Sequence, residues 1–203
     1  MTTFFSTRDV TFDKVVHEER VSTTGFILAA KEFIEILDPF FNPLFIPLRA
    51  QYRRDLEYIM TSYNATKGLD YLDDMLRHEK NLPCNHVKCT HGTYGITRLA
   101  RAFSFIHESF RLLVDDHLDS PVKLPDIFRE AHAKTWAKHN DPLTNKIFQV
   151  AIGGCPSKAA LVARMGGEAN IDQVKIEATA YFLHFGRCKD IIGRYCEGHG
   201  FKI

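Results

Sequence analysis

Three polar residues between positions 51 and 58 have the types and the spacing of a small ligand-binding group. Gln51, Asp55 and Tyr58 stand at i, i+4 and i+7, which places their side chains on one face of a helix. An amide, a carboxylate and a phenol can together donate and accept several hydrogen bonds. This face therefore suits the binding of a polar ligand.

A second row of polar residues lies further along the chain. Tyr94, Arg98 and Arg101 are separated by four and three residues, and the same line continues with Phe105 and Leu112. If this stretch is a helix, one line along it carries polar groups at the N-terminal end and apolar groups beyond them. Such a line suits an amphiphilic ligand. The alternative is a buried helix with a solvated arginine face, since long cationic side chains normally extend into water.

Other residues that could do chemistry form weaker patterns. His139 ends a predicted helix, and one loop holds four potential zinc ligands at a spacing too compressed for the usual zinc finger. These four are Cys84, His86, Cys89 and His91. We find no glycine-rich phosphate loop, no G-x-S-x-G or H-E-x-x-H motif, and no recognisable set of nucleophile and base. We therefore expect no enzyme, no metal and no cofactor.

The arginines must be positioned by the long proline-free stretch from Thr90 to Leu118. Its apolar residues recur at helical spacing on one stripe, which predicts a helix packed into a core. The stripe consists of Ile96, Leu99, Phe103, Ile106, Phe110, Leu113 and Val114. The helix that carries Gln51 is predicted to begin near Pro47, after a proline-rich turn.

Helical patterns dominate the rest of the sequence, without a convincing strand pattern or an internal repeat. We predict further helices over 24–37, 67–80, 126–139, 143–152, 156–165 and 172–197. The fold class is therefore all-α, with about eight helices. A single domain spans residues 23–203, and residues 1–22 form a loosely attached N-terminal arm.

Composition excludes several classes of protein. Lys plus Arg is 26 against 25 for Asp plus Glu, so no overall charge favours nucleic acid. No apolar run suits a membrane span, and the first twenty residues lack a signal-peptide core. Five irregularly spaced cysteines fit reduced thiols, so we expect a cytoplasmic protein. We also expect a monomer. Sixteen phenylalanines imply a thick aromatic core or a lined apolar cavity, and composition leaves both open.

Three segments, in this order and at these separations, resemble the glycolipid transfer protein family: NPLFIPLRAQYRRDLEYI, GTYGITRLARAFSFI and NKIFQVAIGGCP. The resemblance spans roughly residues 24 to 203 and includes the ending Phe201-Lys202-Ile203. It implies a two-layer sandwich of helices around an apolar pocket for lipid chains, with a polar headgroup site at its mouth. The implied activity is transfer of a sphingolipid between membranes, in transient contact with their surfaces and without chemical conversion.

The resemblance implies headgroup contacts on the helix of Gln51, and this chain departs from them. The family has an acidic residue at the position of Gln51, which holds the ceramide amide together with a histidine. Asp55 stands where glycolipid carriers have asparagine and ceramide-phosphate carriers have lysine. Tyr58 stands where the glycolipid branch has lysine. Asp55 either replaces part of the missing acidic contact or forms a salt bridge across the helix pair.

On the central helix the resemblance is closer to the phosphate-binding branch. Arg98 stands where glycolipid carriers stack a tryptophan on the sugar and where phosphate carriers have arginine. Arg101 matches a second arginine of that branch, and Tyr94 replaces a third. The family histidine corresponds to His139 if one residue is inserted, and otherwise Asn140 takes its place.

These substitutions predict a headgroup class. Guanidinium groups can bind phosphate bidentately, whereas the carboxylate of Asp55 repels an anion. Two positive charges, from Arg98 and Arg101, and one negative charge, from Asp55, leave roughly one net positive charge at the site. Trp136, the only tryptophan, lies too far along another predicted helix to stack on a sugar. We expect a phosphoceramide-like or other small-headgroup sphingolipid first, a simple glycosylceramide second and a bulky glycolipid last.

The apolar pocket is expected to be lined by residues on inward stripes of the enclosing helices. The predicted wall residues are Phe33, Phe45, Ile46, Phe103, Ile106, Phe148 and Leu183. The alternative for these positions is a filled core. A second interpretation of the whole chain is an interaction module that has kept the fold and lost transfer, because Gln51 and Tyr94 depart from both headgroup patterns.

Overall fold

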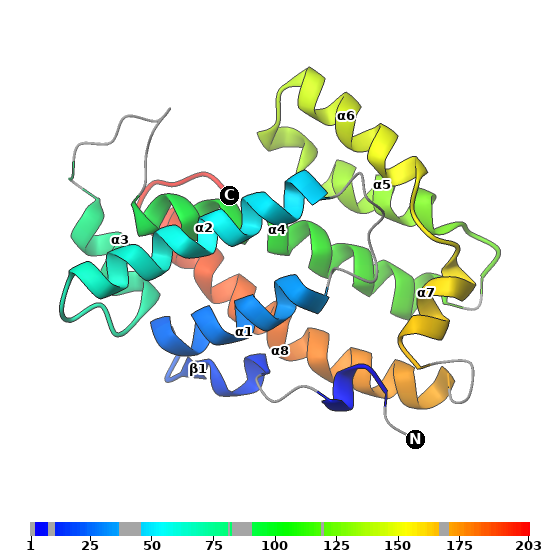
Figure 1. Cartoon of the computed structure of the whole chain (residues 1–203), viewed down its shortest axis with the longest axis horizontal. Helices are drawn as coiled ribbons and strands as arrows, with labels where there is room; N and C mark the ends of the chain where they lie inside the picture. Colours follow the sequence, from blue (N-terminus) through cyan, green and yellow to red (C-terminus); the bar gives the residue numbers. More distant parts are fainter. Residues whose placement is uncertain are drawn as a thin grey trace.

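The computed structural model describes residues 3–7, 11–36, 46–80, 82, 91–118, 120–166 and 171–203. Within these residues the chain is all-α, as predicted, and contains eight α-helices (Figure 1). They are α1 Thr23–Ile36, α2 Ile46–Ala65, α3 Leu72–Glu79, α4 Gly92–Arg111, α5 Leu124–Lys134, α6 Pro142–Gly153, α7 Lys158–Arg164 and α8 Ile171–Gly198. None of the described helices is long and apolar enough to cross a bilayer.

The shorter elements begin, interrupt or extend these helices. They are the 3-10 turns Phe5–Thr7, Phe12–Lys14 and Ala137–His139, and the π-helical segment Leu112–His117, which continues α4. A two-stranded antiparallel hairpin, β1 Val16–His17 and β2 Arg20–Val21, was not predicted. Strands of two residues are too short to show an alternating pattern, and Glu19 at the turn bonds Arg187 and Arg194 of α8.

Helix α4 is the central element of the fold and packs against α2, α3, α5 and α8. Every residue of its predicted apolar stripe is at most 5% exposed, which confirms that stripe. Helix α4 approaches α2 closely at Gly95, where a Cβ atom would overlap the carbonyl oxygen of Asp55. Because Arg98 follows one turn later on α4, this contact brings Arg98 opposite the side chain of Asp55.

An aromatic cluster fills the layer between α1, α4 and α8. The ring of Phe185 lies 4.6 Å from Phe33, 5.0 Å from Phe103 and 4.9 Å from Phe12, measured between centroids. Phe12 is only 1% exposed, and Val21 is fully buried. Within the described part of residues 1–22, the expected loose arm is attached to the core through Phe5, Phe12, Val15 and Val21, while residues such as Lys14 and Glu18 are exposed. Phe12 supplies a ring that completes this cluster, a role that its polar flanking sequence concealed.

Candidate functional site

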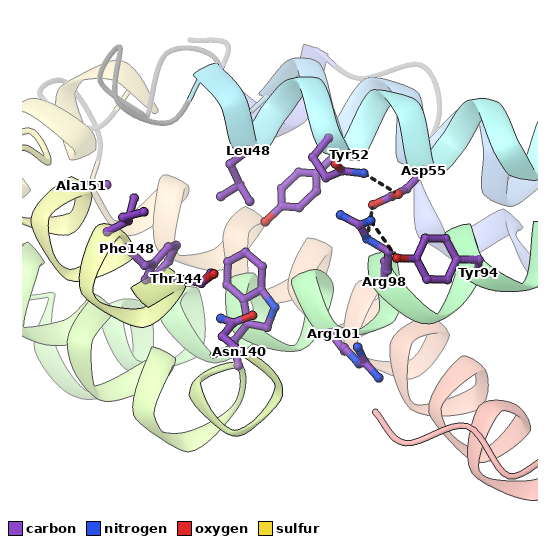
Figure 2. A pocket seen from close by; sticks show the side chains of 13 residues that line it. Leu48, Tyr52, Asp55, Tyr94, Arg98, Arg101, Asn140, Thr144, Phe148 and Ala151 are labelled. Carbon is purple, nitrogen blue, oxygen red and sulfur yellow. Dashed lines mark hydrogen bonds and ion pairs between the residues drawn. The ribbon is translucent and has the colours of Figure 1, made fainter. Parts of the chain in front are cut away.

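A cavity of about 480 Å³ lies between α2, α4, the end of α5 and α6. One end of it is polar and the other apolar (Figure 2). Its walls are formed by Leu48, Gln51, Tyr52, Asp55, Tyr94, Arg98, Arg101, Trp136, Asn140, Thr144, Ile147, Phe148 and Ala151. The structure thus brings the two predicted polar rows together across one cavity, apart from Tyr58.

At the polar end, four side chains form a continuous series of contacts between α2 and α4 (Figure 2). Gln51 Nε2 donates to Asp55 Oδ1 at 2.8 Å, and Asp55 Oδ2 forms an ion pair with Arg98 Nε at 3.4 Å. Arg98 Nη1 donates to the hydroxyl of Tyr94 at 3.3 Å. The salt bridge considered for Asp55 is therefore present, and its partner is Arg98.

The amide of Gln51 is oriented by the carboxylate beside it. An ionised carboxylate only accepts hydrogen bonds, so the amide nitrogen of Gln51 must face Asp55. The Oε1 atom of Gln51 then remains as an acceptor on the cavity wall. Arg98 likewise keeps its Nη2 group without a partner among the described residues. The polar end thus offers one neutral acceptor and one cationic donor group.

Asp55 is a buried carboxyl group, only 1% exposed. Burial raises its pKa from 3.8 to about 6, while Arg98, the hydrogen bond from Gln51 and the charge of Arg54 oppose the rise. The folded protein therefore holds a proton on Asp55 at a pH where the unfolded chain has released it. The contribution of this proton to the free energy of unfolding is fully present below pH 3.8 and is lost as the pH rises through 6.

We expect Asp55→Asn to remove this pH dependence. Between pH 7.5 and pH 4, the wild-type unfolding free energy should rise relative to that of Asp55→Asn. A shift from 3.8 to about 6 corresponds to at most about 3 kcal/mol. Urea unfolding of both proteins across this range measures the difference. Parallel stability curves would show that Asp55 has an ordinary pKa.

Arg101 lines the cavity, but its guanidinium group is directed away from Asp55 (Figure 2). Its Nε and Nη2 atoms donate to the carbonyl oxygen of Lys202 at 3.2 and 2.6 Å. Burial lowers the pKa of Arg101, and the charge of Arg98 adds to this effect. Arg101 therefore attaches the C-terminal segment to α4, and only part of its guanidinium group remains for a ligand.

The turn after α5 places His139 and Asn140 in different depressions of the surface. Asn140 lines the cavity, whereas His139 lines a neighbouring depression of about 410 Å³ together with Lys134 and Lys138. Asn140 leaves the 3-10 turn in an extended conformation, which places consecutive side chains on opposite sides of the chain. Of the two candidates for the family histidine position, Asn140 is the one that lines the cavity. Tyr58 is half-buried on α2 and is not one of the lining residues of the cavity.

Trp136 was expected to lie too far away, and that was wrong. Helix α5 ends at Lys134 instead of continuing to residue 139, and the chain turns there. This turn places the indole in the cavity wall, stacked on Phe105 at 5.8 Å and edge-on to Phe148 at 5.0 Å between centroids. The indole of Trp136 therefore lines the cavity, whereas a helix continuing to residue 139 would have placed it elsewhere.

The predicted chain-pocket residues separate into four groups. Phe148 lines the cavity, and Phe33, Phe103 and Ile106 are buried in the core. Ile46 and Leu183 are 52% and 69% exposed, so their inward placement was wrong. Phe45 lies outside the described residues. Ile46 is exposed because it is the first residue of α2. Leu183 is exposed because it lies about 200° around α8 from the buried Phe185.

The compressed group of potential zinc ligands falls mostly outside the described residues. Cys84, His86 and Cys89 are among the residues that the structure does not describe, and His91 begins the next described segment. In the described part of the chain, no cluster of three or more histidine, cysteine or acidic residues could hold a metal ion. The loop therefore remains a sequence observation.

Comparison with protein families decides the relationship of this chain. The model of the glycolipid transfer protein family matches residues 21–167. The chain belongs to the glycolipid transfer protein family. Comparison with curated protein sequences gives no match.

Solved structures show that the similarity extends over the whole fold. FAPP2, which selects simple glycosphingolipids with this fold, matches at TM-score 0.85 and 19% identity over 100% of this chain and 98% of that one. HET-C2, a fungal glycolipid transfer protein, matches at 0.83 and 23% over 96% and 97%. Human ceramide-1-phosphate transfer protein, in complex with 12:0 ceramide-1-phosphate, matches at 0.81 and 15% over 94% and 93%. At these identities the likeness shows the shared fold alone.

Proposed function

We propose that this protein carries a sphingolipid between membranes without changing it chemically. The observation that carries the proposal is the cavity between α2, α4 and α6, with the Gln51–Asp55–Arg98–Tyr94 series at one end and apolar side chains at the other. An amphiphile needs both surfaces in one site. Membership of the glycolipid transfer protein family supports the same conclusion.

The ceramide amide is proposed to bind between Gln51 and Asn140. Gln51 Oε1 can accept the amide N–H, since its Nε2 is bonded to Asp55. Asn140 Nδ2 is buried and has no hydrogen-bond partner among the described residues, so it can donate to the amide carbonyl. Asn140 would then do what the family histidine does, and His139 would have no direct contact with the lipid.

The headgroup is proposed to bind at Arg98. Its free Nη2 group suits a phosphate oxygen, because hydrogen bonds to charged acceptors are stronger than neutral ones. The pairing with Asp55 neutralises part of this charge, and Arg101 is partly occupied by Lys202. We therefore keep the predicted preference for a small or singly charged headgroup, with bulky glycolipids last. Tyr94 positions Arg98 through its hydroxyl. It also puts a neutral group where the phosphate-binding branch of the family has a third arginine.

The lipid chains are proposed to enter beyond Phe148, between the two layers of helices. Each methylene moved out of water contributes about 0.8 kcal/mol, so the chains dominate affinity and the headgroup decides identity. Phe33, Phe103 and Ile106 are closely packed with their neighbours. They can contact a chain only if the layers separate. The proposed pocket is therefore one that opens as the lipid enters.

A face of α6 is proposed to contact the membrane. Leu143, Ile147 and Val150 stand at i, i+4 and i+7 and are 67%, 62% and 65% exposed. Ile147 also lines the cavity, and Ile46 at the start of α2 is exposed as well. An apolar patch beside a cavity for an amphiphile would let the lipid pass from the bilayer to the protein without crossing water.

We expect the double variant Leu143→Asp with Val150→Asp to reduce vesicle association about tenfold or more. Two large side chains would no longer leave water at the bilayer surface, and each contributes about 1.5 kcal/mol or more when buried. Flotation with vesicles measures the association. Ile176→Asp is the control, because Ile176 is as exposed as these residues, at 64%, but lies on α8 instead of α6. Equal losses in both proteins would contradict a membrane face on α6.

We further propose that the carrier works as a monomer in the cytoplasm. Cys155, Cys188 and Cys196 are free thiols, which is typical of a reducing compartment. Native mass spectrometry of the purified protein tests the function and the oligomeric state together. A monomer with a bound lipid of sphingolipid mass supports a carrier. A protein that neither retains nor takes up any sphingolipid supports the interaction module instead.

A further inference from the structure

One buried polar atom in the cavity is unused by the contacts proposed above. The side chain of Tyr52 is 3% exposed and forms part of the cavity wall, next to Leu48. Its hydroxyl is buried and has no hydrogen-bond partner among the described residues. Figure 2 shows the hydroxyl end directed into the cavity and away from Asp55. Tyr52 therefore presents an unsatisfied donor and acceptor to whatever occupies this space.

A tyrosine in this position needs a reason, because phenylalanine would fill the same space without burying a polar atom. Buried hydroxyl groups almost always find a partner, since removing them from water without one is unfavourable. Burial raises the pKa of Tyr52, and the nearby Asp55 raises it further, against the lowering effect of Arg98. The group is therefore a neutral phenol at any physiological pH. Such a group matches a neutral hydroxyl better than it matches a charged headgroup.

The position of Tyr52 indicates which part of a lipid it would meet. In the proposed binding mode Gln51 and Asn140 hold the amide of the ceramide and Arg98 holds the headgroup, and the 3-hydroxyl common to every sphingoid base is placed on the same polar side. Tyr52 Oη faces away from the polar series, on the side of Leu48, where the first atoms of the lipid chains would pass. A hydroxyl on a chain close to the amide would reach this part of the wall.

We propose that Tyr52 recognises an additional hydroxyl group on the ceramide, close to the amide. This inference rests on the proposed function and adds a specificity to it. Two lipid structures supply such a hydroxyl: a 2-hydroxy acyl chain and a sphingoid base hydroxylated at carbon 4. Both present the same chemistry to the phenol, one from each chain. The wild-type protein then prefers a hydroxylated sphingolipid to the same lipid without the extra oxygen.

The test uses three phosphoceramides with equal chain lengths: one without an extra hydroxyl, one with a 2-hydroxy acyl chain and one with a 4-hydroxy sphingoid base. Transfer between vesicles is measured for the wild type and for Tyr52→Phe, which removes only the oxygen. We expect the wild type to transfer at least one hydroxylated lipid about fivefold faster, as one hydrogen bond allows. The hydroxylated lipid that the wild type prefers shows whether Tyr52 binds a hydroxyl on the acyl chain or on the sphingoid base.

Tyr52→Phe should lose this preference and transfer the plain lipid at least as fast as the wild type. Tyr63→Phe is the matched control, since Tyr63 is a partly buried tyrosine on the same helix outside the cavity wall. It should keep the preference. Equal transfer of all three lipids by the wild type, or an unchanged preference in Tyr52→Phe, would overturn the inference and leave the carrier function intact. No transfer of any of the lipids would overturn both.

Discussion

Replacing Arg98 with alanine is expected to reduce transfer of the preferred anionic sphingolipid about tenfold or more, with the helical fold retained. Hydrogen bonds to a charged group contribute about 1.5–3 kcal/mol, and the Nη2 group of Arg98 is free to make them. The fold should survive, because Asp55 already has a pKa of about 6 and can take up a proton when its partner is lost. Vesicle transfer assays with circular dichroism measure both quantities.

The matched control for this variant is Arg129→Ala. Arg129 also pairs with a carboxylate, Asp126, at 2.7 Å, but it lies on α5 and is not one of the residues that line the cavity. Its removal should leave transfer unchanged. If Arg98→Ala transferred the best lipid as fast as the wild type, Arg98 would have no part in the headgroup site. If both variants lost transfer equally, the effect would be one of overall charge.

Replacing Gly95 with alanine is expected to have the largest effect on stability, a loss of about 3 kcal/mol or more. An added Cβ would overlap the carbonyl oxygen of Asp55, and a backbone atom in the middle of α2 cannot move aside as a flexible side chain can. Helix α4 would have to move away from α2, which also separates Asp55 from Arg98. For a chain of this length the melting temperature should fall by roughly 6–12 °C.

Gly153→Ala provides the comparison for this variant. Gly153 ends α6, and a Cβ there would have no heavy atom from elsewhere in the described residues within 4 Å. Its stability should be unchanged or slightly raised, because alanine favours a helix more than glycine does. Thermal unfolding of the two variants side by side makes the measurement. Equal melting temperatures would mean that α2 and α4 do not depend on their close approach.

The helices and their buried faces could be predicted from the sequence because helical periodicity is a local property. The stripe from Ile96 to Val114 is buried as predicted, and α8 begins and ends within one residue of its predicted range. The headgroup rows were also visible, since residues at i, i+4 and i+7 share a helix face wherever the helix packs. Their meeting across α2 and α4 depended on the family resemblance.

Most of the errors concern features that depend on tertiary structure. Trp136 joins the cavity because α5 ends at Lys134, and no local signal separates a helix from a turn at that point. Leu183 is exposed because it lies about 200° around α8 from Phe185, so helical spacing alone could have excluded it from the buried face. The contact of Arg101 with Lys202 joins residues about a hundred positions apart. Tyr52 could be assigned to the inward face of α2, but not to a cavity.

The most direct test of the proposed function is a competition assay between donor and acceptor vesicles. The donors contain equal amounts of a phosphoceramide, a monoglycosylceramide and a ceramide with several sugars, all with the same chains. We expect the phosphoceramide to move fastest, the monoglycosylceramide more slowly and the larger glycolipid slowest, because Arg98 favours a phosphate. Equal or faster transfer of the lipid with several sugars would contradict the proposed headgroup site, and no transfer of any of the three would contradict the carrier function itself.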